Sequence, residues 1–171
     1  MGFLTNWLSK GMEEEANKYK DLLKQEGFIA NKVICNVYSH TIFAVDTENK
    51  KWCSFEDKDY YVKLEKHPKL DIDTYTFNEF VKYDIQMVDG KSWDFKNGVL
   101  VGGTFIGTTT THQPINQMKV IITTNSKDID KSSVVVKLSN GIVNYGTSGY
   151  NQIISIMEEL QKIFEYILNN K

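Results

Sequence analysis

Two thiols and three imidazoles are the side chains of this sequence that are best suited to nucleophilic catalysis or metal binding. The thiols belong to Cys35 and Cys53, and the imidazoles to His40, His67 and His112. A catalytic cysteine needs a neighbouring base, yet both cysteines lie in apolar, β-like stretches, and the histidines lie in loops or at strand ends. No Cys-x-x-Cys or His-x-x-x-His spacing occurs. We therefore expect two small buried cysteines, and we assign no catalytic or metal-ligating residue.

Acidic residues at i,i+2 spacing are the next candidates, because paired carboxylates can perform general acid–base catalysis. The pairs are Asp57 with Asp59 and Asp71 with Asp73. No third group is expected to perturb the pKa of either pair, so the pattern indicates the solvated face of a half-exposed strand. His67 is followed by a proline and is expected to be a turn residue. The sequence thus predicts no enzyme.

A glycine-rich apolar run, Gly98 to Gly107, could in principle cradle a phosphate group through backbone N–H groups. A phosphate loop also needs a lysine and a hydroxyl residue that open a helix, whereas threonines and His112 follow here. We therefore assign no cofactor and expect a loop between two strands. Because the run is apolar, a second interpretation is a loop that touches a partner or a membrane, and its candidate contact residues are Val99, Leu100, Phe105 and Ile106.

The N-terminus offers a compact apolar patch that is formed by Phe3, Leu4, Trp7 and Leu8. This patch fits three roles: packing on the chain's own sheet, docking onto a protein partner or a second copy, and membrane contact. Glu13–Glu15 follow directly and would be repelled by an anionic membrane. The predicted loop 46–51 carries two lysines but also two acidic residues, which makes a weak site for a lipid headgroup.

Composition restricts the class of protein. The chain has 171 residues, of which 41% are hydrophobic and 25% charged, as in globular domains. All 20 basic residues are lysines and 22 residues are acidic, so the formal net charge of −2 argues against nucleic-acid binding. No apolar run approaches the roughly 18 residues of a membrane span, and no signal peptide opens the chain. We expect a cytoplasmic protein.

Hydrophobic periodicity predicts a helix, then many short strands, then a helix. The first helix is expected over residues 1–27, with a possible break at Gly11 and a stop at Gly27. The last is expected over about 149–169, with Ser148 as its N-cap. Between them the predicted strands are Val33–Tyr38, Thr41–Val45, Lys51–Phe55, Ile72–Thr76, Lys82–Val88, Ser92–Phe95, Val99–Val101, Met118–Thr123 and Ser133–Leu138. Asp89-Gly90 is the strongest hairpin signal.

Several segments resemble a group of small proteins of Gram-positive bacteria and their prophages that have a pleckstrin-homology-like (PH-like) fold and no assigned activity. They are Thr41-Ile-Phe-Ala-Val-Asp46, Asn49-Lys50-Lys51-Trp52, Thr76-Phe-Asn-Glu-Phe-Val81, Tyr83-Asp84-Ile85, Val88-Asp89-Gly90 and Gly98–Gly107. The group often begins with a small zinc-ribbon module, where this chain has a helix. The resemblance implies an α+β fold: an antiparallel PH-like partial barrel of about seven strands, capped by a C-terminal amphipathic helix.

These observations divide the chain into an N-terminal helical extension, residues 1–27, and a PH-like domain, residues 28–171, with strands over about 33–138. The expected function is non-enzymatic: an interaction or adaptor module that recognises a protein partner or self-associates through the N-terminal helix and an exposed strand edge. One alternative is a peripheral membrane or lipid-binding domain that uses Trp7 and the loop 99–106. A second is a hydrolase built on Cys53.

Overall fold

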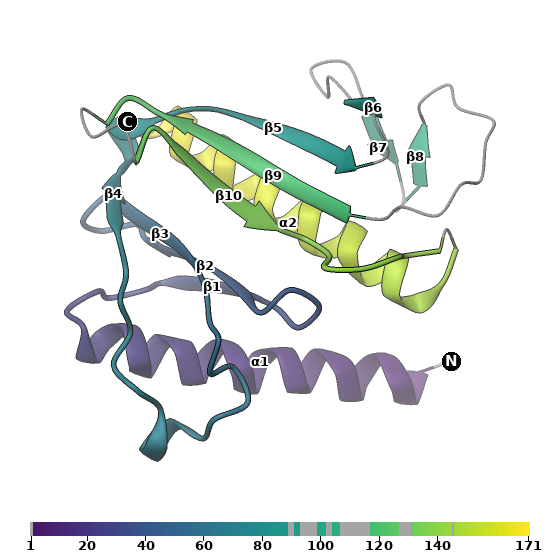
Figure 1. Ribbon diagram of the computed structural model, residues 1–171, viewed down its shortest axis with the longest axis horizontal. Helices are drawn as coiled ribbons and strands as arrows, with labels where there is room; N and C mark the ends of the chain where they lie inside the picture. The colour runs from purple at the N-terminus through teal and green to yellow at the C-terminus, as the bar shows by residue number, and fades with distance from the viewer. Residues whose placement is uncertain are drawn as a thin grey trace. The chain divides into compact units, whose positions relative to one another are not determined.

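The computed structural model describes residues 2–88, 91–92, 99–101, 104–106, 117–126, 131–144 and 146–171, and among these it leaves the side chains of 2–10, 88, 91–92, 99–101 and 104–106 undescribed. Two long helices, α1 (Gly2–Gln25) and α2 (Ser148–Asn169), stand at the two ends of the chain (Figure 1). The predicted α+β class is confirmed. Within the described ranges, neither helix offers the long apolar stretch that a transmembrane segment requires.

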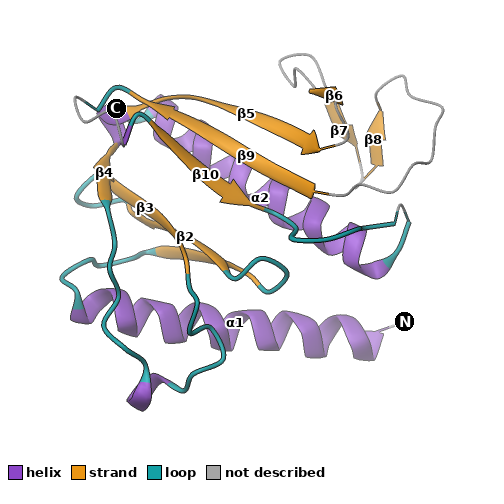
Figure 2. Ribbon diagram, viewed as in Figure 1, coloured by secondary structure: helices purple, strands orange, loops and turns teal. Residues whose placement is uncertain are grey.

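Antiparallel strands fill the middle of the chain (Figure 2). They are β1 (Lys32–Asn36), β2 (Thr41–Asp46), β3 (Lys51–Glu56), β4 (Thr74–Thr76), β5 (Phe80–Val88), β6 (Lys91–Ser92), β7 (Val99–Val101), β8 (Thr104–Ile106), β9 (Gln117–Thr124) and β10 (Ser133–Lys137). The described strands form three separate sheets rather than one closed barrel. Their orders are β1-β2-β3-β4, β10-β9-β5-β6 and β7-β8.

The chain divides into two compact units, residues 1–76 and 77–171. The first contains α1 and the sheet β1-β2-β3-β4, and the second contains α2 and the sheet β10-β9-β5-β6. In each unit a long amphipathic helix packs against antiparallel strands, which is the α+β arrangement that buries one face of a sheet.

In the first unit, α1 ends as the sequence predicts. Gly27 adopts a φ of +80°, which favours glycine, and its N–H donates to the carbonyl of Lys24 at 3.1 Å. The N–H of Phe28 donates to the carbonyl of Leu23 at 2.9 Å, which completes a Schellman motif. The break at Gly11 does not occur, since α1 continues through this residue.

The sheet of the first unit buries side chains on both of its faces. Toward α1, alternate residues Val33, Cys35, Ile42, Ala44 and Cys53 pack with Tyr19, Leu22 and Leu23 of the helix. On the opposite face the rings of Phe43, Trp52 and Tyr75 stack across β2, β3 and β4, with centroids 5.7 Å and 4.5 Å apart. Burial on both faces fixes the register of these strands, because a slip by one residue would exchange the two sets.

In the second unit, α2 covers one face of the sheet, as the one-sided pattern of the sequence predicts. Buried alternate residues of the sheet are Ile85, Met118, Val120, Ile122, Val134 and Val136. Phe164 of α2 lies with its ring centroid 5.4 Å from that of Phe80 and 4.8 Å from that of Tyr83. The helix therefore closes the apolar face of this sheet.

Several element boundaries differ from the prediction. The strand expected at Val33–Tyr38 ends at Asn36, because the following residues form the turn to β2. The strand expected at Ile72–Thr76 begins only at Thr74, because the preceding residues belong to a loop. The strand expected at Ser92–Phe95 is described as β6, Lys91–Ser92, while Asp89, Gly90 and Trp93–Phe95 lie outside the described residues. The N-cap of α2 is Thr147 rather than Ser148, since the Thr147 hydroxyl accepts a hydrogen bond from the N–H of Tyr150 at 3.2 Å.

Alanine substitution at Thr147 and at Ser148 tests which of the two residues is the N-cap of α2. We expect Thr147→Ala to lower the free energy of unfolding by about 1 kcal/mol, because it leaves an N-terminal N–H of the helix without its acceptor. Ser148→Ala should change it by less than about 0.5 kcal/mol, because Ser148 is already within the helix. Urea titration followed by circular dichroism measures both values, and equal losses in the two variants would contradict the assignment.

Candidate functional site

Among the described residues, the connection between β3 and β4 is the longest loop that joins two strands. It runs from Asp57 to Asp73 and contains one 3-10 turn, Leu64–Lys66. Loops longer than about 12–15 residues are uncommon in compact domains and are often functional. Figure 1 shows this loop passing α1 on its way from β3 to β4.

Asp57, the first residue of the loop, is buried with 5% of its surface exposed. One carboxylate oxygen, Oδ2, accepts hydrogen bonds from the Tyr19 hydroxyl and from His67 Nε2, the latter at 2.8 Å. The other, Oδ1, accepts from the N–H of Asp59 at 2.8 Å. The carboxylate thus joins α1 (through Tyr19) to both halves of the loop. We call Tyr19, Asp57 and His67 the Asp57 cluster.

These contacts determine which groups of the Asp57 cluster are ionised. Burial by itself raises the pKa of Asp57, but the hydrogen bonds from Tyr19, Asp59 and His67 outweigh it and hold the pKa below its ordinary value. Burial, followed by the hydrogen bond to Asp57, raises the pKa of Tyr19. At neutral pH the cluster therefore contains a carboxylate and a neutral phenol.

The His67 side chain is buried with 1% exposure. Its Nε2 faces Asp57, and its Nδ1 lies 2.8 Å from the carbonyl oxygen of Pro68. Both partners are acceptors, so both contacts are hydrogen bonds only when each ring nitrogen carries a proton. The contact of Nε2 with Asp57 fastens the second half of the loop.

A chain of rings leads from the Asp57 cluster to the surface. The ring of Tyr60 lies 5.9 Å from that of Tyr19 and stacks on His40 at 4.8 Å with an interplanar angle of 13°. Tyr61 stands edge-on to His40 at 5.0 Å, and its hydroxyl lies 3.2 Å from His40 Nε2. Tyr60 is 4% exposed, whereas Tyr61 is 80% exposed. The loop therefore buries one tyrosine and presents the next.

Lys18 of α1 supports the same part of the loop. Its Nζ donates to the carbonyl oxygen of Tyr60 at 2.5 Å and lies 5.1 Å and 5.5 Å from the ring centroids of Tyr19 and Tyr60. A cation at such distances is attracted to the ring faces. Farther along the loop, Lys69 lies 3.4 Å from the carboxylate of Glu26, the first residue after α1. The loop is thus tied to α1 at several points.

His40 also carries a backbone constraint. It adopts a φ of 54°, the left-handed region that histidine enters more readily than most residues, and it closes the turn between β1 and β2. Its carbonyl oxygen accepts from the N–H of Asp57 at 2.9 Å. A backbone hydrogen bond therefore joins His40, whose imidazole contacts Tyr61, to Asp57 of the cluster.

The Asp57 cluster corrects one expectation from the sequence. Asp57 was expected on a solvated strand face, but it is buried after the end of β3, because Tyr19 and His67 supply hydrogen-bond donors that sequence spacing does not reveal. Asp59, Asp71 and Asp73 are exposed as expected, but they lie in the loop and not on a strand face. His67 does end a 3-10 turn, but its side chain is part of the cluster. Tyr19, Tyr60 and Tyr61 were not among the candidates.

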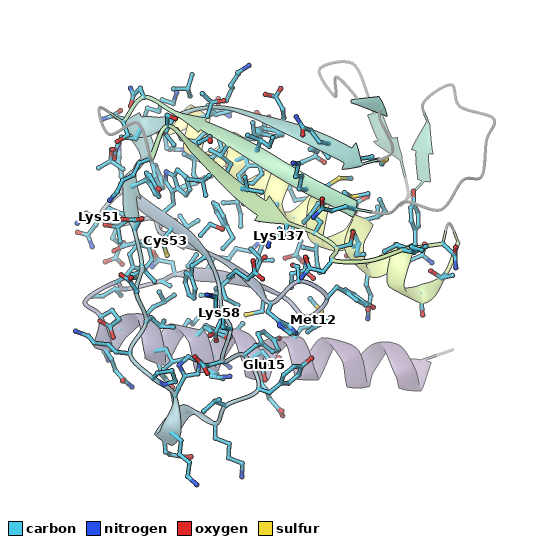
Figure 3. All side chains as sticks on the ribbon, in the orientation of Figure 1. Met12, Glu15, Lys51, Cys53, Lys58 and Lys137 are labelled. Atoms are coloured by element: carbon cyan, nitrogen blue, oxygen red, sulfur yellow. The ribbon has the colours of Figure 1, made fainter. Side chains whose placement is uncertain are left out.

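Both cysteines are free and buried, which confirms the expectation for their placement. Figure 3 shows Cys53 among other side chains, whereas Lys51 on the same strand points outward. Burial raises the pKa of each thiol to about 12, so the thiolate is scarce at neutral pH. Within the described part of the chain, no three His, Cys, Asp or Glu side chains gather as metal ligands do.

The predicted interaction residues lie where side chains are not described. Phe3, Leu4, Trp7 and Leu8 belong to the first turns of α1. Val99 and Leu100 belong to β7, which pairs with β8, where Phe105 and Ile106 lie. Their side chains, and the whole of His112, are outside the described residues, so these predictions stay predictions.

Comparison of the chain with protein-family models, with curated proteins and with solved structures finds no match.

Thiol reactivity tests the burial of the cysteines. We expect neither Cys35 nor Cys53 to react appreciably with iodoacetamide at pH 7 while the protein is folded, and both to react once urea unfolds it. Mass spectrometry of alkylated peptides measures this. Rapid alkylation of Cys53 in the folded protein would contradict its burial and would favour the alternative of a hydrolase built on Cys53.

The Asp57 cluster predicts a specific pH dependence. Asp57→Asn should lower the free energy of unfolding by about 3 kcal/mol at pH 7, because it breaks a buried charged network. The pKa of Asp57 is lower in the folded protein than in the unfolded chain, where it is near 3.9. The stabilisation by the Asp57 charge is therefore complete at pH values above the pKa of the unfolded chain, and it is lost as the pH falls through the pKa of the folded protein.

The difference between the wild type and Asp57→Asn should therefore narrow from pH 6 to pH 2 in urea titrations. Asp71→Asn is the matched control, because Asp71 is exposed in the same loop. A difference that is independent of pH would show that Asp57 does not act through its charge.

Proposed function

We propose that this chain is a non-enzymatic, cytoplasmic binding module whose first unit recognises a protein partner through Tyr61 and His40. The observation that carries the proposal is the exposed ring of Tyr61, which contacts His40 and Tyr60. We call Tyr61, His40 and the two exposed residues of the β1–β2 turn, Val37 and Tyr38, the Tyr61 surface. Val37 and Tyr38 are each 38% exposed.

An exposed aromatic ring that is held in one orientation is a good anchor for a partner. Tyrosine offers a large apolar contact area and a polar tip, and it loses little conformational entropy on binding when its position is already fixed. Tyr61 meets this condition, because His40 contacts both its ring and its hydroxyl, and Tyr60 packs edge-on to it at 5.3 Å. Such residues dominate the energetics of many protein interfaces.

The exposed charges of the loop that carries Tyr61 are balanced. The exposed lysines are Lys58, Lys63, Lys66 and Lys69, and the exposed acidic residues are Asp59, Glu65, Asp71 and Asp73. Such a mixed rim would set the orientation of a partner rather than supply most of the affinity.

A binding role also agrees with the chemistry of the buried groups. The Asp57 carboxylate and the His67 imidazole use their hydrogen-bonding capacity on each other, on Tyr19 and on the backbone, and both are buried from a substrate. The high pKa of the thiols disfavours a cysteine nucleophile. In the proposed binding module, Asp57 and His67 hold the loop that presents Tyr61.

The proposal includes the PH-like kinship of residues 28–171. What supports it is the order of elements: antiparallel strands in two four-stranded sheets, followed by a single C-terminal helix that packs on the second sheet. The side chains of the N-terminal patch would enlarge the binding surface or contact a membrane, and the experiment below separates these outcomes.

Affinity capture with the full chain tests the Tyr61 surface. We expect a protein that the wild type retains from a lysate of the cells that produce the chain to be lost at least tenfold with Tyr61→Ala. Tyr166→Ala is the matched control, because Tyr166 is also an exposed tyrosine, 44% accessible, but lies on α2 in the second unit. This control should retain the partner.

Two results would contradict the proposal. One is an unchanged set of captured proteins with Tyr61→Ala, while circular dichroism shows both variants folded. The other is capture of no protein, together with sedimentation of the wild type on anionic vesicles at physiological salt, which would favour the membrane alternative.

A further inference from the structure

The second unit carries a strand edge that is suited to pairing with another strand. In the part of the chain that the structure describes, β9 is the one strand that hydrogen-bonds to β10. The edge strand is Ser-Val-Val-Val-Lys, with three consecutive β-branched residues and no charge before Lys137. An exposed edge of this composition is a template for another strand.

Hydrogen bonding to β9 shows which backbone groups are turned to this edge. The N–H of Thr124 donates to the carbonyl of Ser132 at 3.0 Å, and the N–H of Leu138 donates to the carbonyl of Met118 at 2.7 Å. Antiparallel ladders alternate, so the even-numbered residues of β10 bond to β9. The N–H and C=O groups of Ser133 and Val135 therefore point away from β9.

The other side of this sheet is protected in the ways that natural proteins protect their edges. Within the described ranges, β6 pairs with Gln86 and Met87 of β5, and the first half of β5 borders the sheet there. That half has an irregular register between Phe80 and Lys82, and it carries the exposed ion pair of Lys82 with Asp84, at 3.5 Å. Bulges and charges of this kind discourage edge pairing, and β10 has neither before Lys137.

We propose that β10 pairs with β10 of a second copy of this chain, antiparallel and about a two-fold axis at Val135, so that the two four-stranded sheets become continuous. This inference goes beyond the Tyr61 surface and is independent of it, because the two features lie in different units. Antiparallel pairing of identical strands is the self-complementary contact that two-fold symmetry requires.

The register centred on Val135 satisfies both faces of the sheet. Val135, which is 46% exposed, meets Val135 of the partner subunit on the outer face, and Val134 meets the partner's Val136 on the inner face. Ser133 lies opposite the partner's Lys137. Cross-strand pairs of β-branched residues are favourable, and the first of these pairs buries apolar surface that is open in the single chain.

Electrostatics allow this register. The two Lys137 side chains stand four residues apart along the paired strands, about 14 Å. This separation exceeds the Debye length of about 8 Å at physiological ionic strength, so they repel weakly. Centring the pair on Val136 would place Lys137 opposite Val135 and leave Ser133 without a partner. The register at Val135 uses the most backbone groups.

Reciprocal charge substitution at Val135 tests the pairing. In sedimentation equilibrium we expect the wild-type mass to rise with concentration from 19.7 kDa toward twice that value. Val135→Lys and Val135→Glu should each stay monomeric, because like charges then meet at the two-fold axis. An equimolar mixture of the two variants should associate again, since opposite charges meet there. Val81→Lys is the matched control, because Val81 is 43% exposed on β5.

Restoration of association in the mixture distinguishes a direct contact from a folding defect, because a misfolded variant would not be rescued by its opposite. A wild type that remains at 19.7 kDa up to millimolar concentration would overturn the proposal. So would Val135→Lys that associates as the wild type does, or a mixture that stays monomeric while both variants are folded by circular dichroism.

Cross-linking checks the register independently. Under a mild thiol oxidant, Val135→Cys should form a disulfide-linked dimer at least tenfold faster than Val81→Cys, because directly opposed residues lie about 5.5 Å apart at their Cα atoms. The native cysteines are buried and so do not compete. Equal rates in the two variants would contradict the register.

Discussion

The carboxylate of Asp57 lies where β3 ends and a long loop begins, and it is almost fully removed from water. A charge in such a place is tolerated only if hydrogen-bond donors surround it. Tyr19, His67 and the N–H of Asp59 are those donors, and they come from the helix and from two separate parts of the loop. The need to satisfy one charge therefore dictates the course of residues 57–67.

The exposed surface follows from this buried constraint. Once Asp57 and His67 are fixed, the loop places Tyr60 under His40 and leaves Tyr61 outside. A loop without such anchoring would lose more conformational entropy when it bound a partner. In the second unit, the surroundings of β10 similarly follow from how its sheet is formed, since α2 covers one face of the sheet and β9 pairs with one edge of the strand.

The sequence predicts elements well where one local signal is sufficient. Gly27 stops α1 because a left-handed residue is needed there, and the apolar stripe from Tyr150 to Leu168 predicts a helix face that is buried as far as Ile167. Strands with clear alternation, such as β5 and β9, are found close to their predicted positions. The sequence did not predict the Asp57 cluster, because its members are separated by up to 48 residues along the chain and no spacing rule links Tyr19 with His67. Choosing Ser148 over Thr147 as the cap was wrong for a smaller reason, since two adjacent hydroxyls give the same signal.

We expect the Asp57 cluster to hold the β3–β4 loop as firmly as the sheet beside it. Native-state hydrogen exchange followed by NMR measures this in the unaltered protein, at the amides of Asp57, Asp59 and Val62, which all donate hydrogen bonds in the loop. We expect their protection to be within about tenfold of that of the amides of β2 and β3. Exchange of these three amides at the rates of an unfolded chain, while β2 and β3 remain protected, would contradict the account.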